Sequence, residues 1–262
     1  RGIVVDDEIN QGGYYANEDE DDHDIAIIAF YNRDSIKPFP CYSVSENSGT
    51  FPNTLFEYNP STQKWIRVGE VGPASESIQA IATDPINNII YAYNSNQNVL
   101  GIIDPNSATP SLFSPINTNL IGKGVGTANG DYGTVKLDSI VAITYDPVNM
   151  ILYGVHRIYS GDICNPIRDT NDLLFQIDVS TGRFIPGAML DSSGNPVGYA
   201  VIEQTVDDAV LGFCTIGGGV VYDVNGIAYN AYTGELFAFH NQGESEIVTI
   251  INQIDGTLEA NI

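Results

Sequence analysis

The fold is decided by the stretch Ile81-Ala82-Thr83-Asp84-Pro85, which leads to Ile90-Tyr91-Ala92. The apolar, β-branched and aromatic residues in both runs favour β-strands. Between the runs, Asp84 can hydrogen-bond the backbone of the residues that follow it, and Pro85 presets the backbone of a turn. This order of residues predicts a β-hairpin.

The same hairpin recurs twice without a gap in the alignment, and each Asp or Asn stands the same distance before an aromatic residue. The two further copies are Ile143-Thr144-Tyr145-Asp146-Pro147 leading to Leu152-Tyr153-Gly154, and Ile227-Ala228-Tyr229-Asn230-Ala231 leading to Leu236-Phe237-Ala238. Self-similarity of this kind indicates a repeat architecture, in which each repeat is one small unit of packed strands.

A second motif follows each hairpin and ends in another Asx residue. Its copies are Leu100-Gly101-Ile102-Ile103-Asp104, Leu174-Phe175-Gln176-Ile177-Asp178 and Val248-Thr249-Ile250-Ile251-Asn252. A fourth copy stands upstream at Leu55–Asn59, followed by a strand at Trp65–Val68, and we expect its hairpin half at Ile27–Asn32 with Cys41–Val44. Each unit therefore reads as strand, turn, strand, loop, strand, turn, strand.

Four antiparallel strands repeated in this way are typical of a propeller blade. The phrases Ala80–Tyr91 and Phe175–Gly182 resemble the repeats of bacterial and archaeal β-propellers of the NHL/YVTN-like group, and the resemblance covers most of residues 24–262. We predict an all-β β-propeller of four-stranded antiparallel blades. Four blades are countable, and five is the alternative because the insertions at 115–135 and 187–219 could hold degenerate strands. The resemblance implies a fold but no activity, because such propellers serve adhesion, scaffolding and catalysis alike.

Residues 1–23 stand outside the repeat as an acidic N-terminal extension, and residues 24–262 form the predicted propeller domain. Gly2, Ile3, Val4 and Val5 form a short β-rich run. This run either packs on the last blade of its own chain or is donated to the open sheet edge of a neighbouring subunit, which would make it an assembly site.

The net charge of −23 argues against nucleic acid as a partner, because phosphate binding needs clustered cations. No apolar run approaches the length of a membrane helix, so we expect no membrane insertion. The chain begins at Arg1 with no export leader and lacks Asn-X-Ser/Thr acceptor sites, which suits a trimmed, secreted or cell-surface chain of prokaryotic origin.

Two groups of residues are candidate metal ligands. The acidic run at 18–24 contains Asp19, Asp21, Asp22 and Asp24, whose hard oxygen atoms suit Ca²⁺; the alternative is a solvated charge run. His156 and His240 stand at the same repeat position, where a third unit has Asn94. They are either ligands at one mouth of a central channel or two unrelated histidines at strand ends.

The three cysteines allow one disulfide, for which we expect Cys164–Cys214, with Cys41 buried. Aromatic residues recur at blade positions, where we expect them to pack between neighbouring sheets. They are Tyr91, Tyr153, Phe237, Phe56, Phe175 and Trp65.

No Ser/His/Asp triad, phosphate-binding loop or nucleophilic cysteine can be assigned. The sequence therefore favours a non-catalytic extracellular propeller that acts as an adhesion, envelope or filament subunit through protein contacts or self-association. The alternatives are a metal-dependent, lactonase-like propeller hydrolase and a carbohydrate-binding module that recognises glycans.

Overall fold

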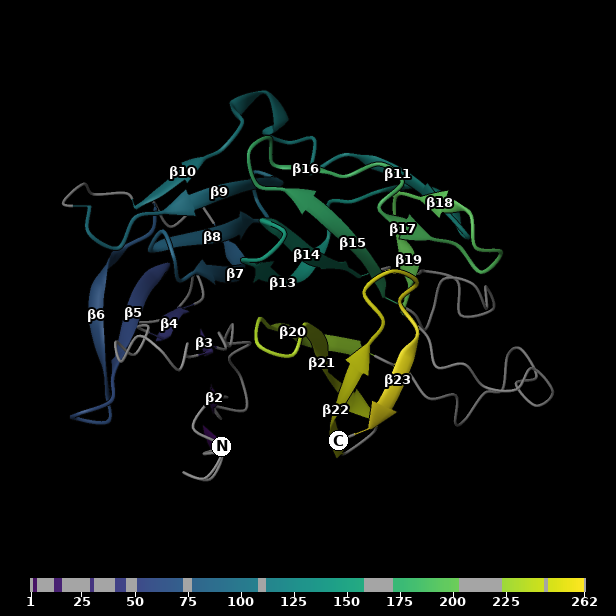
Figure 1. The fold of residues 1–262 in the computed structure, drawn as a ribbon. Helices are drawn as coiled ribbons and strands as arrows, with labels where there is room; N and C mark the ends of the chain where they lie inside the picture. Colours follow the sequence, from purple (N-terminus) through teal and green to yellow (C-terminus); the bar gives the residue numbers. More distant parts are fainter. Residues whose placement is uncertain are drawn as a thin grey trace. The chain divides into compact units, whose positions relative to one another are not determined.

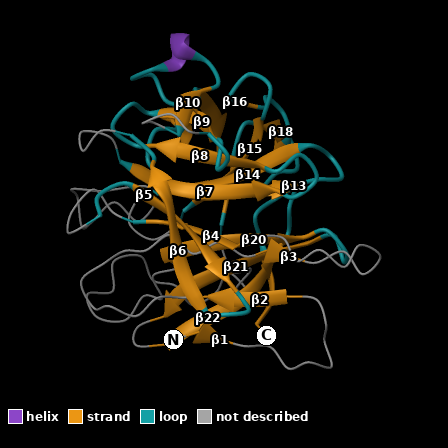
Figure 2. Cartoon of the chain, turned by 90° about the vertical axis from the view of Figure 1, so that its left-hand side faces the viewer, coloured by secondary structure: helices purple, strands orange, loops and turns teal. Residues whose placement is uncertain are grey.

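The computed structural model describes residues 2–3, 12–15, 29–30, 41–45, 51–72, 77–107, 112–157, 172–202, 223–242 and 245–261. In these residues the regular structure is β-strand, apart from one short 3-10 helix, η1 (Thr118–Leu120) (Figures 1 and 2). No helix in this part of the chain is long and apolar enough to cross a membrane.

Three sheets each contain an antiparallel meander of four strands, in which each strand pairs with the next one along the chain, and the second of these sheets has a fifth short strand beside the meander. The first consists of β7 (Ile78–Asp84), β8 (Ile89–Asn94), β9 (Val99–Ile103) and β10 (Phe113–Pro115). The second consists of β13 (Ile140–Asp146), β14 (Ile151–His156), β15 (Leu173–Asp178) and β16 (Arg183–Phe184). The third consists of β20 (Asp223–Asn230), β21 (Glu235–Gln242), β22 (Ser245–Ile251) and β23 (Leu258–Asn261). These meanders confirm the predicted fold class, an all-β fold built from the four-stranded antiparallel blades of a β-propeller.

The repeat extends to the pairing register. Asn94 pairs with Ile78, His156 with Ile140 and His240 with Val224, and in each sheet the register shifts immediately after this pair. A β-bulge at one position in three sheets shows that the sequence repeat is a structural repeat.

The upstream unit differs from its prediction in one hairpin. β4 (Cys41–Val44), β5 (Thr54–Asn59) and β6 (Lys64–Glu70) form a three-stranded sheet. The expected partner of β4, Ile27–Asn32, contributes β3 (Ala29–Phe30), which pairs instead with β2 (Gly12–Tyr15) in a sheet with β1 (Gly2–Ile3). The prediction was wrong here because a short run of apolar, β-favouring residues indicates a strand but does not identify the strand with which it pairs.

The two insertions contain further short strands. β11 (Thr127–Gly130) pairs with β12 (Gly133–Lys136), and β17 (Met189–Leu190) pairs with β18 (Pro196–Val197). The Gly198 N–H donates to the Asn129 carbonyl at 2.8 Å, so the two hairpins are joined. β19 (Ala200–Val201) pairs with the first two residues of β15, Leu173 and Leu174.

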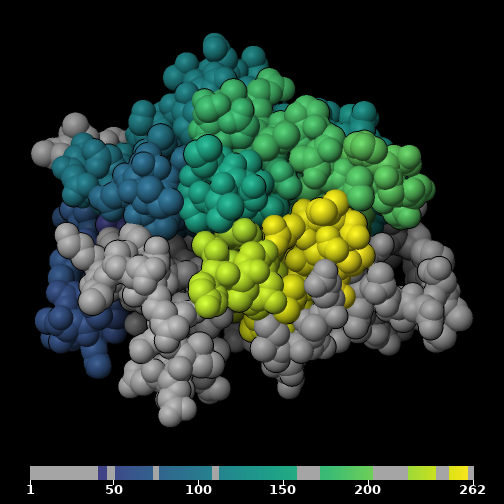
Figure 3. All heavy atoms as spheres, in the orientation of Figure 1, coloured from purple at the N-terminus to yellow at the C-terminus, as the bar shows by residue number. Residues whose placement is uncertain are grey.

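The chain divides into two compact units, each with its own core. Unit 1 comprises residues 1–124, 147–149 and 180–182, and unit 2 comprises residues 125–146, 150–179 and 183–262. In unit 2 the inner strands β13 and β20 lie side by side, and Figure 3 shows the atoms of their sheets closely packed. Tyr153 stacks on Tyr229 with ring centroids 6.0 Å apart, and the Tyr153 hydroxyl donates a hydrogen bond to the Gln253 side-chain oxygen at 2.8 Å.

Asx turns close the hairpins as the sequence predicts. The Asp84 carboxylate accepts the N–H groups of Ile86 and Asn87 at 2.9 and 3.1 Å. Equivalent bonds to the next backbone N–H groups are made by Asn59, Asn230 and Asn252. Because these bonds join neighbours in sequence, the turns form locally and set the register of the strands they connect.

Candidate functional site

The acidic run lies outside the described residues, so Asp19, Asp21, Asp22 and Asp24 have no structural account. The backbone of His240 lies on β21, at the register position expected for it. In the described ranges, no group of three or more His, Cys, Asp or Glu side chains is arranged to hold a metal ion.

His156 is a buried side chain at the end of β14, with 5% of its surface exposed. Its Nδ1 accepts a hydrogen bond from the Ser139 N–H at 3.1 Å, which leaves the proton of the neutral ring on Nε2. Burial lowers the His156 pKa to about 4, against an opposing effect of the Asp138 charge. In this structure the ring closes the open end of the β13–β14 hairpin.

An ion pair follows directly at Arg157. The Arg157 guanidinium lies 3.3 Å from the buried Asp172 carboxylate and also donates to the Val224 carbonyl at 2.8 Å. Asp172 accepts the Val224 N–H at 2.9 Å, so both backbone groups of Val224 are bonded to this pair. Asp172 and Arg157 together therefore join the start of β15 to β20.

The predicted assembly strand has a partner within its own chain. Gly2 and Ile3 pair with Tyr15 and Tyr14 of β2, while Val4 and Val5 lie outside the described residues. Cys41 is a free, buried thiol as expected, and burial raises its pKa to about 11. Cys164 and Cys214 lie outside the described residues.

The strongest candidate for a binding surface is one face of the β5–β6 pair. Tyr58 stands opposite Trp65, and Phe56 stands opposite Arg67. Directly opposed residues, and residues two apart on one strand, share a face of a sheet, so these four side chains project to the same side. The Tyr58 and Trp65 rings meet edge to face with centroids 5.3 Å apart.

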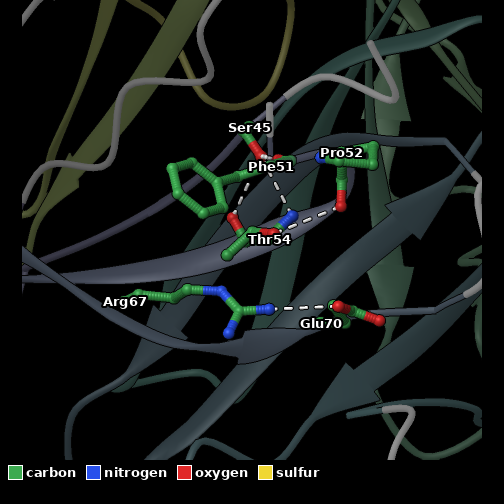
Figure 4. A network of polar contacts seen from close by, with 6 residues as sticks. All are labelled: Ser45, Phe51, Pro52, Thr54, Arg67 and Glu70. Carbon is green, nitrogen blue, oxygen red and sulfur yellow. Dashed lines mark hydrogen bonds and ion pairs between the residues drawn. The ribbon is translucent and has the colours of Figure 1, made fainter. Parts of the chain in front are cut away.

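Phe51 extends this face from the turn before β5. Its ring meets Phe56 edge to face at 6.2 Å, and the Arg67 guanidinium lies 5.8 Å from the centre of the Phe51 ring. Arg67 also pairs with Glu70 at 3.0 Å (Figure 4). We call Phe51, Phe56, Tyr58, Trp65 and Arg67 the aromatic face.

Hydrogen bonds to Ser45 fix the turn that carries Phe51 (Figure 4). The Ser45 hydroxyl donates to the Phe51 carbonyl and accepts the Thr54 N–H, the latter at 3.0 Å. The Thr54 hydroxyl in turn donates to the Pro52 carbonyl at 3.2 Å. Phe51 therefore sits on a pinned turn, which reduces the entropy lost when a ligand orders it.

Trp65 corrects the expectation that all the recurring aromatic residues pack between sheets. Tyr91, Tyr153, Phe175 and Phe237 are buried as predicted, but Trp65 is 41% exposed and Phe51 is 49% exposed. Trp65 lies on β6, an outer strand of its sheet whose consecutive residues Lys64–Arg67 are all exposed, whereas the other outer strand, β4, is mostly buried. The spacing Phe56-x-Tyr58 and Trp65-x-Arg67 was the signal that could have revealed the shared face.

A second exposed feature repeats from sheet to sheet. In the turn between the first two strands of each four-stranded sheet, the residue two places after the Asx is apolar and exposed. These residues are Ile86, Val148 and Tyr232, at 73%, 68% and 73% exposure. Loop positions of this kind usually carry polar residues, so the three apolar side chains are a recurring property of the repeat.

The comparisons with known proteins give no family. No family model matches the chain, and no curated protein matches it. Among solved structures, a Bacteroides thetaiotaomicron protein of unknown function aligns with 91% of this chain and 66% of its own, at 14% identity and a TM-score of 0.45. Myxococcus xanthus glutaminyl cyclase aligns with 86% of this chain and 83% of its own, at 13% identity and a TM-score of 0.42.

Two further solved structures come from different contexts. A chain of a nidogen/laminin complex aligns with 82% of this chain at 11% identity and a TM-score of 0.40, and the alignment spans 57% of that chain. The β-propeller domain of Myceliophthora thermophila Cps50 (Swd1) aligns with 86% of this chain at 12% identity and a TM-score of 0.37, over 55% of its own length. All four TM-scores are below 0.5, so the fold assignment rests on the strand pairing within the sheets and not on these solved structures.

Proposed function

We propose that this chain is a non-catalytic extracellular subunit that assembles with further copies of itself through protein contacts. The observation that carries the proposal is the apolar side chain that recurs in the first turn of three sheets, at Ile86, Val148 and Tyr232. Binding free energy is gained when a partner covers exposed apolar side chains, because their surface is removed from water.

The charge of the chain supports regulated rather than indiscriminate association. A net charge of −23 makes copies of the chain repel one another in solution. Salt or a divalent cation would screen that repulsion and allow short-range apolar contacts to form. The acidic run at 18–24 is the proposed place for Ca²⁺ to act in this way.

Light scattering on eluting size-exclusion fractions tests the proposal, with the chain at low and high concentration in EDTA and in CaCl₂. We expect the mass to rise with concentration and to rise further with Ca²⁺. The double variant Ile86→Ser/Tyr232→Ser should remain monomeric under the same conditions, because it removes two of the apolar contacts. Ile254→Ser is the control, since Ile254 is also apolar and exposed, at 53%, but lies in a different turn.

A monodisperse monomer in every condition would contradict the assembly role. Equal association by the wild type and the double variant would place the contact elsewhere and remove the observation on which the proposal rests.

A further inference from the structure

The aromatic face brings three kinds of group together on one surface. Trp65 and Phe51 expose their rings, Phe56 and Tyr58 lie half-buried beside them, and Arg67 and Glu70 form an exposed ion pair at their margin. We propose that this face binds a neutral carbohydrate chain, with its pyranose rings stacked on Trp65 and Phe51.

Ring chemistry is the first reason for this choice. The face of an aromatic ring carries a negative partial charge, which attracts the polarised C–H groups on one side of a pyranose. The Tyr58–Trp65 and Phe51–Phe56 pairs meet edge to face, at 62° and 79°. These contacts restrict the orientations of the Trp65 and Phe51 rings, which reduces the entropy lost when a sugar stacks on them.

The polar margin is the second reason. Arg67 offers planar N–H donors and Glu70 offers carboxylate acceptors, with one donor and one acceptor atom 3.0 Å apart. Adjacent hydroxyls of a pyranose each donate and accept, so a donor and an acceptor side by side can bond both of them. A purely apolar protein partner would leave this ion pair partly desolvated, at a cost in binding free energy.

Charge decides the kind of carbohydrate. The chain has 33 Asp and Glu residues against 10 Lys and Arg, so its field repels polyanions such as uronate or sulfated polymers. Lys64 and Arg67 on β6 do not reverse that balance, and Arg67 is already paired with Glu70. A neutral glycan approaches without this penalty.

The single tryptophan of the chain makes the proposal directly measurable, because all indole fluorescence comes from Trp65. Cellohexaose, xylohexaose, mannohexaose and chitohexaose are titrated separately while the emission is followed. We expect at least one to give a saturable change with a Kd on the order of 0.1 mM, which is ordinary for a shallow site.

Variants separate the aromatic face from the rest of the surface. Phe51→Ala and Arg67→Ala should each weaken binding by about tenfold, which corresponds to about 1.4 kcal/mol. Ile66→Ala removes an exposed apolar side chain from the opposite side of β6, between Trp65 and Arg67 in sequence, and should leave the affinity unchanged. Trp65→Ala should abolish binding in calorimetry, and far-ultraviolet circular dichroism would verify that each variant is folded.

The proposal is overturned if none of the four hexasaccharides saturates, or if Phe51→Ala and Arg67→Ala bind as well as the wild type. Saturation by an alginate oligomer or a polyproline peptide, without binding of a neutral hexasaccharide, would also overturn it by identifying an anionic or peptide ligand. Self-association is measured separately on different residues, so failure of either proposal is distinguishable from failure of the other.

Discussion

At the scale of single residues, buried polar side chains form hydrogen bonds with backbone groups at the ends of strands, and His156 is the first example. His156 is neutral in the folded chain because burial lowers its pKa to about 4, while in the unfolded chain it titrates near its ordinary 6.5. The unfolded state therefore binds one more proton between these pH values, and the stability that the neutral ring contributes is lost as the pH falls from about 6.5 towards 4.

His156→Asn tests this linkage, because Asn stands at the corresponding position of another sheet and can also accept the Ser139 N–H. Between pH 7 and pH 5 the free energy of unfolding of the wild type should fall by about 2 kcal/mol more than that of the variant. Urea titrations at the two pH values measure this difference. Parallel pH dependences in the two proteins would contradict the assigned protonation state.

Asp172 is the second residue whose role depends on burial. Asp172→Ala removes the partner of Arg157 and the acceptor of the Val224 N–H, so we expect a loss of about 3–5 kcal/mol in the free energy of unfolding. Glu70→Gln breaks the exposed Arg67 pair and should cost less than about 1 kcal/mol. Chemical denaturation measures the free energy of unfolding of both variants. Similar losses in the two variants would contradict a larger stabilising role for the buried Arg157–Asp172 pair.

At the scale of elements, each hairpin turn places its fourth residue after the Asx in the left-handed region. In the first turns of the three sheets this residue is Asn88, Met150 and Gly234, with φ of 53°, 57° and 76°. Asn and Gly suit that conformation, whereas a left-handed backbone costs other residues about 1–2 kcal/mol. Met150 is exposed, so its side chain offers little burial in return.

Met150→Gly should therefore raise the stability of the chain by about 0.5–1 kcal/mol, with the gain reduced by the greater freedom of Gly in the unfolded state. Gly234→Ala is the reciprocal change and should lower stability by a similar amount. Gly256→Ala should cost more, because a Cβ there would meet the Val201 carbonyl oxygen at 2.5 Å. Thermal melts of the three variants rank them, and a destabilised Met150→Gly would refute the strain argument.

At the scale of the whole molecule, the sheets and turns followed from the sequence, but several partners did not. The repeat predicted four units of four strands; three of them are present as four-stranded meanders with a bulge at the same position, and the upstream one has the three strands β4, β5 and β6. The pairing of β3 with β2 and the joined hairpins in the two insertions lay beyond the sequence, because short strands without a repeat can pair with many neighbours.

The candidate site was only partly predictable for the same reason. The two-residue spacing of the aromatic residues on β5 and β6 was visible in the sequence, but the exposure of these side chains depends on which other segments pack against the sheet. The buried state of Asp172 depends on Val224, far along the chain, and no local pattern announces such a contact.

The sequence by itself determined where strands end and turns begin, because Asx side chains bond backbone groups only a few residues away. Tertiary structure alone decided which aromatic rings are covered and which polar groups are paired. Burial is the sum of contacts from distant segments, so Tyr153 and Trp65 play opposite roles, one in a core and one on an open face.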